Sequence, residues 1–184
     1  MEPDESLRGR LLIASPSLFD PNFARTVVLV VEHNDEGAMG IVLTRPSTAT
    51  VAEALPPLED LVDDDEPVYV GGPVESAAVV VLAEFEDTDA AAALVFGDLG
   101  FLRADADPTV LESAARRFRV FAGYSGWGAG QLEAELAEPS WIVESPELED
   151  VFTDDPERLW NSVLRRKGGQ FALIATMPPD PSLN

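Results

Sequence analysis

Few residues in this sequence could carry out covalent chemistry. The run Gly123-Tyr124-Ser125-Gly126-Trp127 approaches the Gly-x-Ser-x-Gly motif, which places a serine nucleophile on a tight turn between a strand and a helix. Trp127 occupies the place of the last glycine, and its bulk would obstruct that turn. The single histidine, His33, would have to act as the general base. The pattern therefore argues against a serine hydrolase.

Cofactor and metal motifs also fail at defined positions. After Gly126 and Gly128, Gln131 stands where the dinucleotide fingerprint requires another glycine. The acidic segment 32–37 looks like the start of a calcium loop, but Leu43 lies at the twelfth position, where a bidentate glutamate is needed. The chain has no cysteine, which excludes disulfides, thiol catalysis and thiolate-bound metals. We expect no cofactor and no metal, since the remaining carboxylate and amide donors would suit magnesium or nothing.

Basic residues at loop positions offer a different chemistry. Arg25 and Arg45 stand beside predicted strands in a chain with 12 basic and 34 acidic residues. A guanidinium can bind a carboxylate or a phosphate through two parallel hydrogen bonds. The alternative for both arginines is an internal ion pair, for example with Glu32 or Glu135. His33, at a strand end, is either a hydrogen-bonded structural residue or a base in an anion-binding site.

Two glycine-rich stretches, Gly71-Gly72-Pro73 and 123–130, each follow a β-branched or aromatic strand. Glycine adds no side chain to the core there, so it suits positions where a backbone, a ring or a ligand comes close. We predict that the stretches lie in contact or face each other across a shallow groove, with Arg45 or Arg25 at its edge. Tyr124 and Trp127 would supply the rings. Gly72→Val should then destabilise the fold by about 1–3 kcal/mol through overpacking.

The candidate binding site joins these polar, glycine and aromatic residues at loops and strand ends, where function concentrates. Two other interpretations remain open: Trp127 could belong to the core, and the glycines before Gln131 could form a hinge between a strand and a helix. The candidate residues are Arg25, His33, Asn34, Arg45, Gly71, Gly72, Pro73, Tyr124, Trp127 and Gln131.

The elements that must position this site are mostly short strands with single helices between them. Segment 26–32 lacks polar alternation and predicts a strand buried on both faces, joined by a wide or bulged turn to a strand that ends before Pro46. The other expected strands are 11–14, 68–70, 78–83, 94–96, 118–122 and 141–143. The expected helices are 51–55, capped by Ser47 or Thr50, then 58–62, 108–117, 131–137 and a final helix that ends at Lys167.

Composition and charge limit the possible function classes. The chain of 184 residues is 46% hydrophobic and suits one domain, which we place at 9–176, between a flexible acidic N-terminus (1–8) and a proline-rich tail (177–184). No apolar run approaches the ~20 residues of a membrane helix, and no secretory signal is visible, so we expect a cytoplasmic protein. The net charge of −22 repels nucleic acid. It reflects either a solubility adaptation or an acidic surface that docks onto a basic partner.

Four segments together resemble the YqgE/AlgH family: 9–23, 25–46, 69–74 (YVGGPV) and 121–141 (FAGYSGWGAGQLEAELAEPSW). The resemblance weakens at 77–111 and at the C-terminus, which lacks the Gly-His-Ala ending of the family. It implies an α+β fold in which bent, mostly antiparallel strands form a pseudo-barrel flanked by helices, and it implies no established enzymatic activity. Members are often labelled transcriptional regulators on the basis of phenotype.

We therefore expect a non-enzymatic binding module for a protein partner or a small anionic ligand, monomeric or weakly dimeric, with a regulatory role. One alternative is an enzyme acting on a small anionic substrate, which needs His33 or a carboxylate as base and an arginine in the same pocket. Another is a DNA-binding regulator, which the negative charge disfavours.

Overall fold

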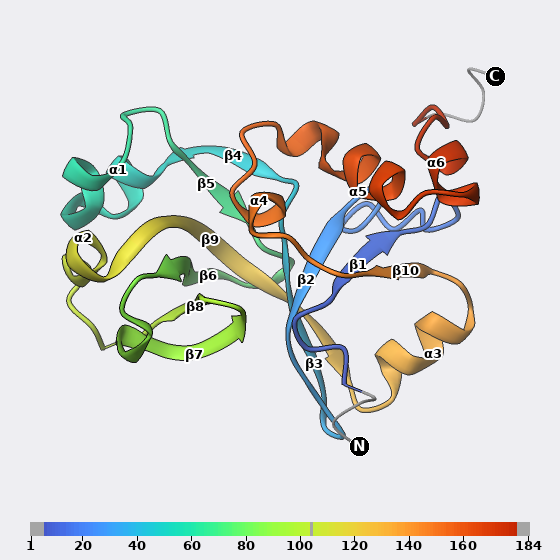
Figure 1. Cartoon of the computed structure of the whole chain (residues 1–184), viewed down its shortest axis with the longest axis horizontal. Coiled ribbons are helices and arrows are strands. Elements are labelled where there is room, and N and C mark those ends of the chain that lie inside the picture. Colours follow the sequence, from blue (N-terminus) through green and yellow to red (C-terminus); the bar gives the residue numbers. More distant parts are fainter. Residues whose placement is uncertain (1–5, 104, 180–184) are drawn as a thin grey trace.

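The computed structural model describes residues 6–103 and 105–179 and contains a strongly curved sheet (Figure 1). Its strands are β1 (Leu11–Ala14), β2 (Val27–Asn34), β3 (Gly37–Val42), β4 (Pro46–Thr50), β5 (Pro67–Val70), β6 (Val74–Phe85), β7 (Ala91–Phe96), β8 (Leu99–Leu102), β9 (Ala115–Gly128) and β10 (Trp141–Glu144). The helices are α1 (Val51–Ala54), α2 (Val110–Ala114), α3 (Gln131–Ala137), α4 (Leu148–Val151), α5 (Leu159–Lys167) and α6 (Gln170–Ile174). Short 3-10 turns are η1 (Pro56–Leu61), η2 (Thr88–Ala90) and η3 (Pro156–Arg158).

Strand β9 connects the two halves of the sheet. The strand order is β10-β1-β2-β3-β9-β6-β8-β7, and β5 joins β9 from the side as a parallel partner, with β4 paired to β5. One end of β9 pairs with β3, and the other end pairs with β6. All pairs except β5–β9 are antiparallel, and the sheet curls into a half-barrel with helices around it. The predicted α+β class is thereby confirmed.

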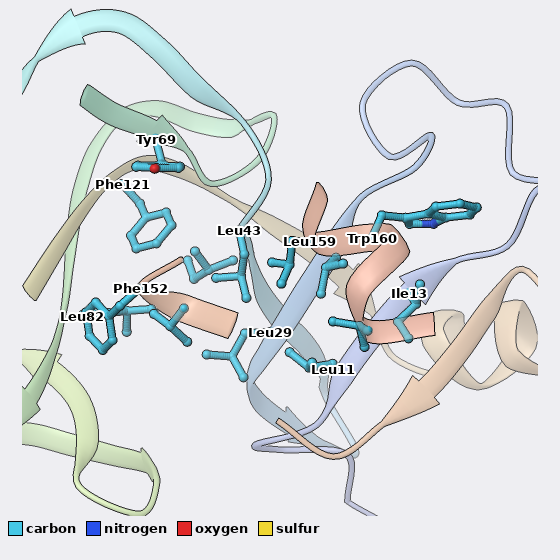
Figure 2. Close-up of a cluster of buried hydrophobic side chains, with 14 of the residues drawn as sticks. Leu11, Ile13, Leu29, Leu43, Tyr69, Leu82, Phe121, Phe152, Leu159 and Trp160 are labelled. Carbon is cyan, nitrogen blue, oxygen red and sulfur yellow. The ribbon is translucent and has the colours of Figure 1, made fainter. Parts of the chain in front are cut away.

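The valine-rich strand β2 is buried on both faces, as its sequence predicts. Val27, Leu29 and Val31 belong to a large apolar cluster that includes Leu159 and Trp160 of α5 (Figure 2). Val28 and Val30 face the opposite way, into a second cluster that Leu132 of α3 helps to cover. Because both faces are covered, polar side chains are excluded from the strand until Glu32.

A third cluster fills the other half of the sheet, under α1, η1 and α2. Its buried members include Val51, Leu58, Phe85 and Leu111. Thr50 caps α1 as predicted: its hydroxyl accepts a hydrogen bond from the amide of Glu53, whose side chain in turn accepts one from the Thr50 amide. This capping box starts a helix of only four residues.

Several boundaries differ from those that the sequence predicts. The strand after the β2–β3 turn ends at Val42, before Pro46 as expected, but Pro46 then begins a further strand, β4, that was not expected. The β2–β3 turn is tight, with Asn34 paired to Gly37, and the bulge lies inside β2. The helix expected at 108–117 ends at Ala114, because Ala115 already pairs with Phe85 of β6. Pairing across the sheet thus overrides the helix propensity of alanine and arginine.

The C-terminal part is also richer in helix than expected. α6 follows directly after Gly168 and Gly169, so the helix ending at Lys167 is not the final one, and α4 is a further helix that the sequence does not predict. In the middle of the chain, strand β8 is also absent from the predicted elements. At the other end, Leu7 and Arg8, expected in the flexible N-terminus, bond to His33 and Val31 of β2. Residues 1–5 and 180–184 of the two predicted tails lie outside the described residues. No helix within the described residues is long and apolar enough to cross a membrane.

Candidate functional site

The two glycine-rich stretches touch through their backbones. The amide of Gly71 donates a 2.9 Å hydrogen bond to the Ala122 carbonyl, and the Ser125 hydroxyl donates to the Gly71 carbonyl at 3.3 Å. A Cβ on Gly72 would lie 2.5 Å from the amide nitrogen of Ser125 and closer still to the carbonyl group of Tyr124. The structure thus places the stretches in contact, but the glycines receive main chain and not an aromatic ring.

A small hollow lies beside this junction. It has a volume of about 50 Å³ and is lined by Asn22, Val42, Arg45, Val70, Gly72 and Pro73. Arg45 is at its edge, and its guanidinium donates to the Ala24 carbonyl at 3.4 Å. Since one water molecule takes up about 30 Å³ in the liquid, the hollow has room for water but not for a metabolite.

Arg25 belongs to a different surface. Its two terminal nitrogens donate to the Met177 carbonyl at 3.1 and 2.6 Å, and its guanidinium lies 4.1 Å from the centre of the Trp160 ring. These residues line a separate, mainly apolar pocket of about 330 Å³. Neither Arg25 nor Arg45 forms the internal ion pair with Glu32 or Glu135 that the sequence allowed, as judged over the described residues. Burial lowers the pKa of both guanidiniums.

His33 is a buried structural residue on β2. Its Nδ1 accepts a hydrogen bond from the amide of Leu7 at 2.9 Å, so Nε2 carries the proton and donates to Glu133 at 2.7 Å. The hydrogen bond from His33 and a backbone hydrogen bond lower the pKa of Glu133, the backbone contribution being the larger. His33 lines neither the hollow nor the two larger pockets.

The predicted aromatic and amide residues also serve the fold. Trp127 and Trp141 both donate their indole N–H to the same oxygen of Glu135, at 2.9 and 2.7 Å. Gln131 accepts from the amide of Gly128 and donates to Glu135. The remaining two are Asn34, which accepts from the amide of Glu36 in the β2–β3 turn, and Tyr124, which packs against the large apolar cluster that includes Leu159 and Trp160.

Of the ten predicted residues, four therefore gather at one place. Arg45, Gly72 and Pro73 line the hollow, and Gly71 lies directly beside it. The others are spread over the β2–β3 hairpin, the first and second apolar clusters, the start of α3 and the Arg25 surface. Their role in binding stays a prediction.

A much larger cavity than this hollow lies elsewhere, between η1, the start of β9 and the segment after α4. We call it the arginine cleft; its volume is about 690 Å³. Three arginines and six carboxylates line it together with an apolar wall. The lining residues are Asp60, Leu61, Val62, Asp63, Glu66, Leu111, Glu112, Ala115, Arg116, Arg117, Phe118, Arg119, Glu149, Phe152 and Asp154.

Arg117 crosses the cleft as a bridge between two elements. Its Nε donates to Glu84 of β6 at 2.7 Å, and Nη2 donates to Glu149 of α4 at 2.8 Å, while the guanidinium covers the ring of Phe152. The hydrogen bond to Glu149 is the main reason why the pKa of Arg117 is raised. Arg116 pairs more loosely with Glu84, at 3.4 Å. Both charges are therefore largely neutralised from within the protein.

Arg119 is held differently, although it is buried. Its Nη1 donates to the carbonyls of Val151 and Thr153 at 3.0 and 2.8 Å, and its guanidinium lies against the Tyr69 ring. Its Nε has no hydrogen-bond partner among the described residues. The nearest carboxylate oxygen, on Glu66, is 3.7 Å away, which is beyond hydrogen-bond range. A buried donor without an acceptor is uncommon and requires a reason.

Glu66 faces this free donor from the loop before β5. Burial raises the pKa of its carboxyl, and Asp63, Asp154 and Asp65 raise it further, while Arg119 opposes them. No group of three or more histidine, cysteine or acidic residues in the described part of the chain is placed to hold a metal ion. The arrangement thus offers a set of carboxylate acceptors to an incoming group, beside a buried arginine whose hydrogen bonds are incomplete.

Sequence reasoning did not find this cleft. The sequence predicts a helix up to Arg117 and a strand from 118, which separates Arg117 from Arg119, whereas both lie on one face of β9. A signal was present, because Arg116, Arg117 and Arg119 are three of only twelve basic residues and lie within four positions.

Comparisons with known proteins agree with the fold and with the sequence segments described above. The AlgH-like family matches residues 11–172. The chain is similar to UPF0301 proteins of Streptomyces coelicolor (46% identity, over 97% of this chain and 96% of the relative) and Thermobifida fusca (43%, over 97% and 96%). Its fold is similar to that of a crystallised protein from Corynebacterium diphtheriae, with a TM-score of 0.85, 28% identity and coverage of 96% and 95%. The solution structure of AlgH from Pseudomonas aeruginosa gives a TM-score of 0.74, 31% identity and 97% coverage of both chains. The resemblance seen in the sequence is confirmed: the chain belongs to the AlgH-like family.

Proposed function

We propose that this protein is a cytoplasmic, non-enzymatic binding module and that its ligand binds in the arginine cleft. The observation that carries the proposal is Arg119, a buried residue of the cleft lining whose Nε has no hydrogen-bond partner among the described residues. The volume of about 690 Å³ supports it, since it lies within the ~300–1,000 Å³ of typical ligand sites.

The cleft is better suited to binding than the residues that the sequence favoured. The hollow beside Arg45 is too small for a metabolite, and the guanidinium of Arg25 is already bound to the Met177 carbonyl. The cleft instead offers an apolar wall, including Val62 and Phe152, next to charged groups. A protein segment or a small ligand could use both.

Binding is favoured over catalysis because of where the only imidazole lies. An enzyme using His33 as base would need that residue beside the substrate, but its ring is buried against Glu133, outside the cleft. A binding module without catalytic activity would exert a regulatory role by controlling which other molecules its bound partner can contact. Direct DNA binding is disfavoured, since a net charge of −22 repels phosphates.

A cleft-blocking variant tests the proposal. Glu112→Trp places a large side chain on an exposed position of the cleft wall, and Glu138→Trp places the same side chain on an exposed position at the end of α3. Wild type and both variants are screened by thermal shift against acidic metabolites, nucleotides and short peptides. A ligand of the cleft raises the Tm of wild type and of Glu138→Trp but not of Glu112→Trp. Equal shifts in all three proteins would place the ligand elsewhere and contradict the proposal.

A further inference from the structure

We infer that the occupant of the arginine cleft is a basic peptide segment, rich in lysine or arginine, of a partner protein. This inference rests on the proposed function and names the chemistry of the ligand. It follows from three features of the cleft: its unpaired rim carboxylates, its already neutralised arginines, and the Glu66 carboxylate, which lies 3.7 Å from Arg119 without a hydrogen bond between them.

The rim of the cleft carries negative charge without internal compensation. Asp60, Asp63, Glu112 and Asp154 are exposed, and none of them forms an ion pair with another described residue. They come from η1, the loop after it, α2 and the segment after α4, so they surround the opening on several sides. Lysine and arginine side chains of a partner would find carboxylates from four different segments at the cleft.

The arginines of the cleft do not reverse this preference. Arg117 forms ion pairs with Glu84 and Glu149, and Arg116 forms a looser one with Glu84, so carboxylates of the protein itself already compensate their charges. An anion entering the cleft would meet six carboxylates and three arginines, and the whole chain, at −22, would repel it over longer distances. The same field speeds the encounter with a basic partner.

The floor of the cleft matches a peptide in particular. The Nε of Arg119 is a free donor beside Glu66, whose carboxylate accepts no hydrogen bond from another described residue. A basic peptide supplies the donor that this carboxylate lacks, since a lysine or arginine side chain can donate to Glu66 and complete the partners of a carboxylate that Arg119 does not reach with a hydrogen bond. The apolar stem of that side chain can pack on the half-buried Val62 and Phe118.

The inference is tested by fluorescence anisotropy with a labelled short peptide of alternating lysine and leucine, and with its glutamate–leucine counterpart. Asp63→Asn/Asp154→Asn removes two charges of the cleft. Asp98→Asn/Glu138→Gln removes two exposed charges elsewhere and serves as the matched control. The lysine peptide should bind wild type and the control alike and bind the cleft variant about tenfold more weakly, the factor expected for two exposed ion pairs. Binding should also weaken as salt is raised.

Two outcomes would separate the inference from the proposed function. If the glutamate peptide binds more tightly than the lysine peptide and Glu112→Trp abolishes its binding, the cleft is a ligand site but its ligand is anionic, and the inference is wrong. If the lysine peptide binds Glu112→Trp and both double variants as tightly as wild type, its attraction is nonspecific and the cleft is not its site. If adding the lysine peptide slows amide hydrogen exchange at residues 63–66 and 153–154, the result would support both the proposed function and this inference.

Discussion

The junction between Gly71-Gly72 and β9 makes a quantitative prediction, because the structure separates two causes of instability there. A Cβ on Gly71 would overlap the carbonyl oxygen of Gly123, without a positive φ. Gly97 has φ +51° but nothing within 4 Å of the added Cβ. Gly72 combines both problems, with φ +154° and a Cβ that would overlap the main chain of Tyr124 and Ser125.

Gly72→Ala should therefore lose more free energy of unfolding than either of the other two alanine variants. Gly97→Ala measures backbone strain alone, about 1–2 kcal/mol for an L-residue in the left-handed region. Gly71→Ala measures overpacking alone, about 1–3 kcal/mol. Gly72→Ala should lose about 2–5 kcal/mol, close to the sum of the two. The value of about 1–3 kcal/mol expected from sequence for Gly72→Val counted overpacking only, and the structure raises it.

Urea unfolding followed by tryptophan fluorescence measures these losses, because Trp127, Trp141 and Trp160 are all buried. Equal m-values across the variants would show that the free energy of unfolding, and not the unfolded state, has changed. If Gly72→Ala loses no more stability than Gly97→Ala, the junction has room for a methyl group and the argument for close backbone packing is wrong.

Three further predictions concern carboxylates. Glu135→Ala should lower the free energy of unfolding by about 2–4 kcal/mol in urea titrations, since two indole N–H groups lose their acceptor; an effect no larger than that of a surface mutation would contradict this. Glu133 has a lowered pKa, so its contribution to stability is complete above its ordinary value of 4.5 and lost as pH falls through the folded-state pKa. Glu133→Gln should therefore flatten the stability–pH curve below about pH 4.5, and an unchanged acid limb would exclude this role. The pKa of Glu66 is shifted in the opposite direction. Burial raises this pKa, so stability is lost as pH rises through the folded-state pKa. Glu66→Gln should be more stable than wild type at pH 7 and equal to it in acid, as Tm measured across pH will show.

Much of the fold could be predicted where local signals agree with the tertiary environment. The unbroken apolar run of β2 indicated burial on both faces, and Thr50 followed by Glu53 indicated a capped helix. The expected strand 118–122 lies within β9, but the start of β9 at residues 115–117 could not be predicted, because Asp107-Pro108 begins a helix and alanine and arginine favour its continuation. Only the pairing with β6, far away in the sequence, makes those residues a strand.

The candidate site was harder to predict for the same reason. Contact between the glycine-rich stretches could be inferred, because repeated glycine after a strand indicates close approach of another chain segment. The arginine cleft could not, since Glu66, Arg119 and Asp154 come from three separate segments that no local pattern connects. His33 and Trp127 looked functional as polar or aromatic residues, but each satisfies a partner inside the fold.

The position of β9 in the chain has a consequence for biosynthesis. β3, β5 and β6 all find their partner in residues 115–128, and β1 finds one of its partners in β10, which is made later still. While the chain emerges from the ribosome, the first two thirds of the protein thus expose several unpaired strand edges with valine-rich faces. Such edges are the surfaces through which incomplete chains associate. The nascent chain must stay unassociated until Gly128 has left the exit tunnel, and a message truncated before codon 115 would yield a product without the strand that joins the two halves of the sheet.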